Sequence, residues 1–142
     1  MKIGPYDFPD DLYYDKNHGW ARVEGNSVTM GLSDFAQKLA KEIVYAEVPR
    51  ANRAVEQGKP FMSVESGKWV GRVFALVSGR VTHSNAELEV TPTLINESPY
   101  GDGWLVKVEA SNLEPELKNL MRTSDPAFAE FIKSEMTKYK AE

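Results

Sequence analysis

The residues of this sequence with the clearest chemical potential are Gly67 and Lys68, which stand between two runs of strand-forming residues. A two-residue connection with glycine first is typical of a type II′ hairpin turn, whose first central residue needs a positive φ. Such a turn would present the Lys68 ammonium on a rigid base. An enzyme that modifies a lysine needs a defined backbone shape, since a flexible loop loses entropy on each encounter. A charged residue at a turn is more often only solvated, so the spacing alone leaves both interpretations open.

The rest of the sequence offers little for catalysis. It contains no cysteine, which excludes a disulfide, a thiolate nucleophile, an iron–sulfur cluster and a Cys-ligated zinc. His18 and His83 are the only histidines, so a three-histidine zinc centre is excluded as well. A nucleophilic pair of Ser66 and Lys68 is not expected, because a tight turn hardly allows the side-chain hydrogen bond that it needs. Any redox or acyl chemistry must therefore come from a group attached to the chain.

Two further polar features have mainly structural interpretations. His18 lies close to Trp20, and a lone histidine in such a place is more often a structural residue than one that orients or binds something. The early carboxylates do not have the spacing of a calcium loop, and we expect them to form a solvated acidic surface. They are Asp7, Asp10, Asp11 and Asp15.

The length of 142 residues is that of one ordinary domain. Lys and Arg number 17 against 21 Asp and Glu, and the resulting net charge of −4 argues against a nucleic-acid or anionic-membrane binder. The chain contains no apolar stretch long enough for a transmembrane helix, and its first residues lack the apolar region of a secretory signal. We therefore expect a cytoplasmic protein with neither nucleic acid nor membrane as a partner.

Short strand-forming runs separated by turn residues predict a mainly β fold, an antiparallel sandwich or barrel. Gly25-Asn26 is typical of a tight hairpin, and Ser33 is suited to cap a short helix over residues 34–40. Residues 91–103 are typical of a loop. The expected strands cover residues 20–24, 28–32, 43–48, 61–65, 69–75, 80–82 and 104–109.

The composition changes after residue 108, where helical patterns begin. Pro115 suits the first turn of a short helix, and Ser124 with Pro126 suits the start of a longer one. The longer pattern has an apolar stripe, which we expect to pack on the barrel: Phe128, Phe131, Ile132, Met136 and Tyr139. The sequence thus predicts one domain, with an N-terminal arm over 1–15, a β core over 16–110 and C-terminal helices over 112–142.

Residues 65–68, Glu-Ser-Gly-Lys, resemble the lipoyl-attachment turn of the glycine cleavage system H-protein family. Residues 96–105, Asn-Glu-Ser-Pro-Tyr-Gly-Asp-Gly-Trp-Leu, are similar to another signature of that family. Further similar blocks occur in the same order at 18–25, 31–37 and 43–49, so the resemblance extends from about His18 to Phe131. Several blocks in register are a specific signal, whereas the lysine turn alone would be a weak one.

The resemblance implies a barrel-sandwich hybrid of the lipoyl/biotinyl type, built of antiparallel strands with a short inserted helix and C-terminal helices. It implies lipoic acid in amide linkage on Lys68, with Glu65, Ser66 and Gly67 forming the cofactor-binding turn. The chain would then be a carrier and not an enzyme, because the dithiolane supplies the two sulfurs that this protein lacks. Lipoate ligase or lipoyl-assembly enzymes and dihydrolipoamide dehydrogenase are the implied partners. A biotin carrier is less similar, since its lysine usually lies between two methionines.

Two positions depart from the glycine cleavage pattern. Trp69 follows the lysine where the family usually has a small residue, and it is either a core residue or an exposed contact for a partner. Gly19, between His18 and Trp20, replaces an acidic residue, which weakens the expectation that an aminomethyl amine binds near the arm. His18 is the second residue we expect at a partner contact.

The run from Gly67 to Gly71 resembles the lipoate-binding proteins of the heterodisulfide-reductase-like sulfur-oxidation system. That branch is the favoured expectation, with sulfur-containing intermediates carried on the Lys68 arm to a heterodisulfide-reductase-like complex. The alternative is an H protein that carries an aminomethyl group from glycine decarboxylase to the aminomethyltransferase. A second alternative is an interaction domain in which Lys68 is never modified.

Overall fold

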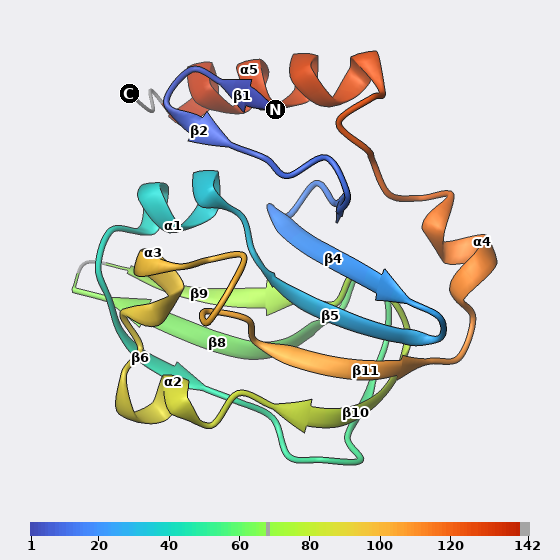
Figure 1. Ribbon diagram of the computed structural model, residues 1–142. Helices are drawn as coiled ribbons and strands as arrows, with labels where there is room; N and C mark the ends of the chain where they lie inside the picture. Colours follow the sequence, from blue (N-terminus) through green and yellow to red (C-terminus); the bar gives the residue numbers. More distant parts are fainter. Residues whose placement is uncertain (68, 140–142) are drawn as a thin grey trace.

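Two antiparallel sheets enclose the main core of the structure (Figure 1), a computed structural model that describes residues 1–67 and 69–139. The larger sheet has the order β3 (Tyr13–Tyr14), β4 (Gly19–Glu24), β5 (Ser27–Leu32), β11 (Val106–Ala110), β10 (Gly79–Ser84) and β7 (Ala54–Val55). The smaller sheet has the order β6 (Ile43–Glu47), β8 (Pro60–Ser66) and β9 (Trp69–Phe74). The mainly β fold expected from the sequence, a barrel-sandwich hybrid of antiparallel strands, is confirmed.

The hairpin and the helix cap predicted from the sequence are both present in the structure. Glu24 pairs with Ser27 across Gly25-Asn26, and Gly25 has the positive φ of 65° that a tight hairpin requires. The Ser33 hydroxyl accepts a hydrogen bond from the Ala36 amide, which caps the short helix α1 (Asp34–Ala40) as predicted.

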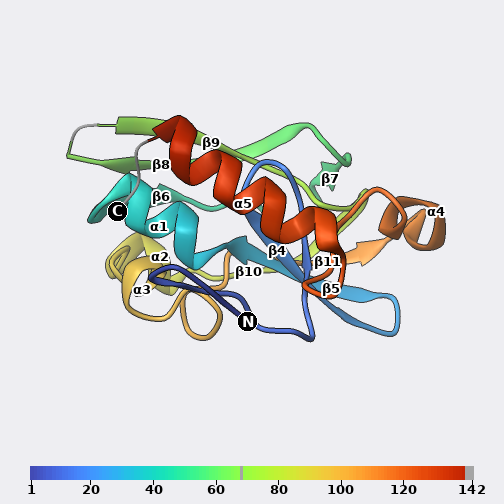
Figure 2. The ribbon, with the colours of Figure 1, turned by 90° about the horizontal axis from the view of Figure 1, so that it is seen from above.

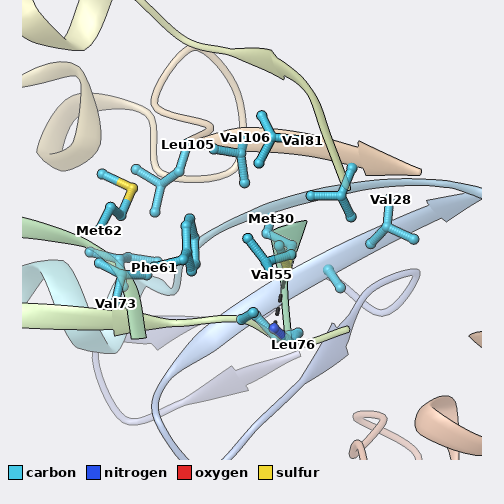
Figure 3. Close-up of a cluster of buried hydrophobic side chains, with 14 of the residues drawn as sticks. Val28, Met30, Val55, Phe61, Met62, Val73, Leu76, Val81, Leu105 and Val106 are labelled. Atoms are coloured by element: carbon cyan, nitrogen blue, oxygen red, sulfur yellow. Dashed lines mark hydrogen bonds between the residues drawn. The ribbon is translucent and has the colours of Figure 1, made fainter. Parts of the chain in front are cut away.

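The main core lies between the inner faces of the two sheets. Figure 3 shows side chains of both sheets meeting there, with Phe61 and Met62 of β8 near Leu105 and Val106. Met30 also accepts a hydrogen bond on its Sδ from the Leu76 amide, at 3.2 Å. Because alternate residues of each strand point into this core, the hairpin of β8 and β9 has a fixed register and a fixed orientation.

In the described part of the chain, four helices lie outside the sheets in addition to α1. They are α2 (Glu87–Val90), α3 (Leu94–Glu97), α4 (Leu113–Leu117) and α5 (Pro126–Tyr139). The segment 91–103, expected to be a loop, therefore contains the short helix α3. Its Asn96 side chain accepts from the Ile43 amide and donates to the Lys41 carbonyl, so it fastens α3 to the start of β6. In the described ranges no helix is long and apolar enough to span a membrane.

Helix α5 covers a second apolar cluster on the outer side of the larger sheet. Figure 2 shows α5 passing above β4, with α1 beside it. Its Phe128 and Ile132 are each 1% exposed and pack with residues of the N-terminal segment, which confirms the expected packing of the apolar stripe. The expected packing is wrong for Tyr139, whose side chain is exposed at the end of the helix.

The N-terminal segment is more than a solvated arm. Strands β1 (Lys2–Ile3) and β2 (Tyr6–Asp7) pair with each other beneath α5, and several of their neighbours are buried in the second cluster. Asp7, Asp10 and Asp11 are exposed as expected. Asp15 is buried, contrary to expectation, because its carboxylate accepts hydrogen bonds from the amides of Asn17 and Gly19.

Candidate functional site

The hairpin of β8 and β9 positions the candidate attachment site. Ser66 pairs with Trp69, so the connection consists of Gly67 and Lys68, as the sequence predicts. Lys68 itself lies outside the described residues. Gly67 is exposed, and its φ lies outside the positive range, so the expected type II′ turn with Gly67 as first central residue is wrong. Among the described residues, a Cβ built on Gly67 would meet nothing within 4 Å. Neither backbone strain nor crowding therefore requires glycine at this position.

A cavity of about 650 Å³ opens beside this turn. Strands β8 and β9, helix α1, the segment 16–18 and the last turns of α5 all contribute to its wall. Figure 2 shows why, since the C-terminal part of α5 ends near the β8–β9 hairpin. Much of the wall is apolar, including Leu32, Leu39, Val64, Val73 and Phe74. The cavity can therefore take an aliphatic chain.

A histidine and a glutamate meet in the cavity wall. His18 Nε2 lies 2.7 Å from Glu135 Oε1, and each side chain is only 12% exposed. Burial lowers the pKa of His18, although the Glu135 carboxylate acts in the opposite direction. A neutral ring beside a carboxylate keeps its proton on Nε2 to donate to Glu135, which leaves Nδ1 as an acceptor. His18 thus lies in the wall of the cavity instead of on an exposed surface.

Two buried polar atoms of the wall have no hydrogen-bond partner in the described part of the chain. They are His18 Nδ1 and the Ser66 hydroxyl oxygen, and the Ser66 residue is 8% exposed. Buried polar atoms normally find a partner, because leaving them unpaired costs about 1–3 kcal/mol. Both atoms belong to residues that line the same cavity.

A tight turn holds the His18 ring in this place. His18 has a φ of 67°, a conformation that is uncommon outside glycine. Asp15 stabilises the turn by accepting from the Gly19 amide at 2.9 Å. Burial raises the pKa of Asp15 to about 6, since desolvation outweighs the hydrogen bonds from the backbone. The ring itself stacks on Phe131 of α5, with centroids 5.4 Å apart.

Trp69 combines the two alternatives that the sequence left open. It is 46% exposed, so it is not a core residue, yet its side chain lines the cavity. A Cβ on Gly71 would lie 1.8 Å from the indole, which shows that the ring lies directly over the Gly71 backbone. The bulky side chain next to the attachment site is therefore accommodated by a glycine two residues later, on the same face of β9.

Glu65 lies on the outer face of the smaller sheet. It pairs with Tyr45 of β6 on one side and with Val70 of β9 on the other. Tyr45 and Val70 are 45% and 68% exposed, so Glu65 is flanked by two exposed apolar side chains. Ser66 and Glu65, neighbours in sequence, thus face the cavity and the outer surface respectively.

Glu135 is the site residue that the sequence analysis did not identify. A usable signal exists, since Glu135 falls four residues after Phe131 and four before Tyr139, within the predicted apolar stripe. A carboxylate on that face requires a partner when the face is buried. The described ranges contain no group of three potential metal-ligating side chains.

Comparisons with known proteins agree on one family. The family model described as glycine cleavage H-protein matches residues 12–135. A probable glycine cleavage system H protein of Pyrococcus abyssi is 44% identical over 135 residues, which cover 94% of this chain and 98% of the relative. A glycine cleavage system H protein of Staphylococcus saprophyticus is 47% identical over 113 residues, covering 80% and 89%. The crystal structure of such a protein from Mycobacterium marinum is similar with a TM-score of 0.77 at 25% identity, covering 90% of this chain and 98% of that one.

Proposed function

Because the chain belongs to the glycine cleavage H-protein family, whose members carry lipoate covalently on a lysine, we propose that Lys68 carries the lipoyl group. The observation that supports this most is that Ser66 and Trp69 pair with each other and both line the cavity, and Lys68 lies between them in the sequence. The short connection limits the freedom of the backbone on both sides of the lysine.

The residues around the cavity fit a lipoyl arm. The arm is an aliphatic chain with an amide at one end and a dithiolane at the other, and the apolar wall suits the chain. The unpartnered Ser66 hydroxyl and His18 Nδ1 suit the polar parts of the arm or of a group carried on it. When bound, the lipoyl group supplies reactive sulfur to a chain without cysteine.

The protein then acts as a carrier subunit and not as a catalyst. In this proposal Gly67 and Glu65 present the turn to lipoate ligase or a lipoyl-assembly enzyme. Glu65 lies on the outer face of the smaller sheet between the exposed side chains of Tyr45 and Val70, so this face is accessible to such an enzyme. Trp69 has enough exposed area to contact a downstream partner as well.

The names of the relatives favour the glycine cleavage system over the sulfur-oxidation branch that the sequence suggested first. The proposed partners are accordingly glycine decarboxylase, the aminomethyltransferase and dihydrolipoamide dehydrogenase. The comparisons reported above give no support to a heterodisulfide-reductase-like partner.

A second candidate function is the carriage of sulfur-containing intermediates, and one observation favours it. Glu135 is the one carboxylate among the described residues that line the cavity, and it is already paired with His18. An aminomethyl ammonium would therefore find no free carboxylate among the cavity-lining residues that the structure describes.

The test is the intact mass of the protein from cells that contain lipoate and its ligase, with fragmentation to locate any added group. We expect one lipoyl group on Lys68 and none in Lys68→Arg. An unmodified Lys68, or a lipoyl group that persists in Lys68→Arg, would overturn the assignment and favour an unmodified interaction domain or another site. Transfer of isotope from labelled glycine by glycine decarboxylase to the modified protein then separates the two candidate functions.

A further inference from the structure

We infer that the cavity beside the β8–β9 turn is selective for an anionic group carried at the end of the arm. This inference rests on the proposed lipoylation of Lys68 and extends it to the charge of the cargo. Because an aminomethyl group is a cation at neutral pH, the inference favours the second candidate function over glycine cleavage. It is carried by the charges around the cavity and by the unpartnered Ser66 hydroxyl.

The charged residues that line the cavity are mostly cations. They are Lys16, Lys41, Arg72 and Lys138, and the one carboxylate among the described lining residues is Glu135. With His18 neutral, this set leaves three net positive charges around one opening. The whole chain has a net charge of −4, so the excess is local and opposes the overall charge. A cleft lined by one sign of charge concentrates ligands of the opposite sign.

The four cations are available to a ligand. All four are exposed, and none forms an ion pair with another residue in the part of the chain that the structure describes. They come from four different segments, the turn before β4, the end of α1, strand β9 and the end of α5. Long, flexible side chains placed on different sides of an opening can converge on one anion.

The single carboxylate does not balance them. Glu135 accepts a hydrogen bond from the Nε2–H group of His18, so part of its hydrogen-bonding capacity is already used. The buried Ser66 hydroxyl can donate to an anion, and its oxygen has no other partner in the described ranges. An ammonium could donate to His18 Nδ1, but it would have to do so among four cations.

The lack of cysteine makes a direct experiment possible. After reduction of the lipoylated protein, the two thiols of the arm are the only thiols in the molecule. Iodoacetate, iodoacetamide and 2-bromoethylamine then convert them to an anionic, a neutral and a cationic arm of similar length. Binding of each arm in the cavity, here called seating, is measured by the shifts of the NMR resonances of the His18 ring and the Trp69 indole. Both side chains line the cavity.

We expect the anionic arm to shift both resonances, with a seated population about tenfold higher than that of the cationic arm in low salt. The difference should shrink towards 1 M salt, where the screening length falls to roughly 3 Å. Equal shifts for the three arms, or larger shifts for the cationic arm, would overturn the inference. A protein without a lipoyl group on Lys68 would instead overturn the proposed attachment. In that case the free alkylated dihydrolipoamides, added to the unmodified chain, test the charge preference separately.

Charge reversal locates the effect. Lys41→Glu and Lys138→Glu should each reduce the shift caused by the anionic arm at least about threefold. Lys133→Glu is the matched control, since Lys133 is exposed on the same helix as Lys138 and does not line the cavity. An equal reduction in Lys133→Glu would mean that only the net charge of the protein matters, and it would contradict a selective cavity.

Discussion

The His18 imidazole and the Glu135 carboxylate, 117 residues apart in the chain, meet at 2.7 Å in the wall of the candidate arm cavity. The contact joins the turn before β4 to the last part of α5. It also sets the tautomer of His18, because the proton on Nε2 faces the carboxylate and Nδ1 is left as an acceptor in the wall. One hydrogen bond thus couples the docking of the C-terminal helix to the chemistry of the cavity.

Removal of the Glu135 carboxylate should destabilise the protein, because His18 loses its hydrogen-bond partner. In Glu135→Ala the Nε2–H group loses its acceptor in a mostly buried place, and we expect a loss of about 1–3 kcal/mol in the free energy of unfolding. Urea denaturation measures it, and Glu135→Gln, which keeps an acceptor, should lose less. Glu130→Ala on the exposed side of α5 is the control. Equal losses in Glu135→Ala and Glu130→Ala would show that the hydrogen bond contributes nothing specific.

The buried carboxylate of Asp15 should make stability depend on pH. Its pKa is about 6 in the folded protein against an ordinary value of 3.8, so the folded state binds more protons between these two values. The contribution of Asp15 to stability is complete below pH 3.8 and is lost as the pH rises through about 6. Asp15→Asn keeps one acceptor oxygen and has no charge to bury.

We therefore expect Asp15→Asn to gain stability relative to the natural protein between pH 4 and pH 7, by about 1–3 kcal/mol. Chemical denaturation at a series of pH values measures the difference, and Asp11→Asn at an exposed carboxylate is the control. A constant difference across this range would contradict the raised pKa. The lowered pKa of His18 acts in the opposite sense in both proteins, since its contribution is lost as the pH falls below 6.5.

A side chain at Gly71 should displace the Trp69 indole without unfolding the protein. A Cβ there would lie 1.8 Å from the ring, but the ring is half exposed and can swing outward. We expect Gly71→Ala to change the stability by less than about 1 kcal/mol and to shift the Trp69 emission towards that of a solvated indole. The fluorescence of Trp69→Ala and of the double variant with Gly71→Ala, subtracted from that of the matching proteins with Trp69, gives the contribution of this tryptophan. An unchanged emission in Gly71→Ala would show that the ring does not depend on Gly71.

Substitution of Gly67 should separate recognition of the turn from its folding. Because neither a positive φ nor a close neighbour requires glycine there, Gly67→Ala should leave the thermal midpoint within about 2 °C of the natural protein. If the lipoylating enzyme contacts the bare turn, the rate of lipoyl transfer to Lys68 should fall at least fivefold in the same variant. A normal rate would show that the enzyme tolerates a side chain beside the lysine. Gly25→Ala, in the distant hairpin with a φ of 65°, should show the reverse pattern.

The sequence by itself determined the fold, because its signals are local. Strand-forming runs and turn residues such as Gly25-Asn26 act over a few positions, and Ser33 caps α1 within one turn. The family was readable for the same reason, since the blocks at 65–68 and 96–105 are contiguous in the chain. The two-residue connection that contains Lys68 needed only the spacing of two strand patterns.

The candidate site depended on contacts that no local pattern contains. Only the packing of α5 decided that Glu135 meets His18, and only the burial of the turn before β4 made Asp15 a buried carboxylate. The sequence could not predict whether Trp69 is buried or exposed. Its position depends on Gly71, whose lack of a side chain leaves room for the indole, and on the cavity that the indole lines. Side-chain burial and charge clustering arise from segments that are distant in sequence, so the tertiary structure alone decided them.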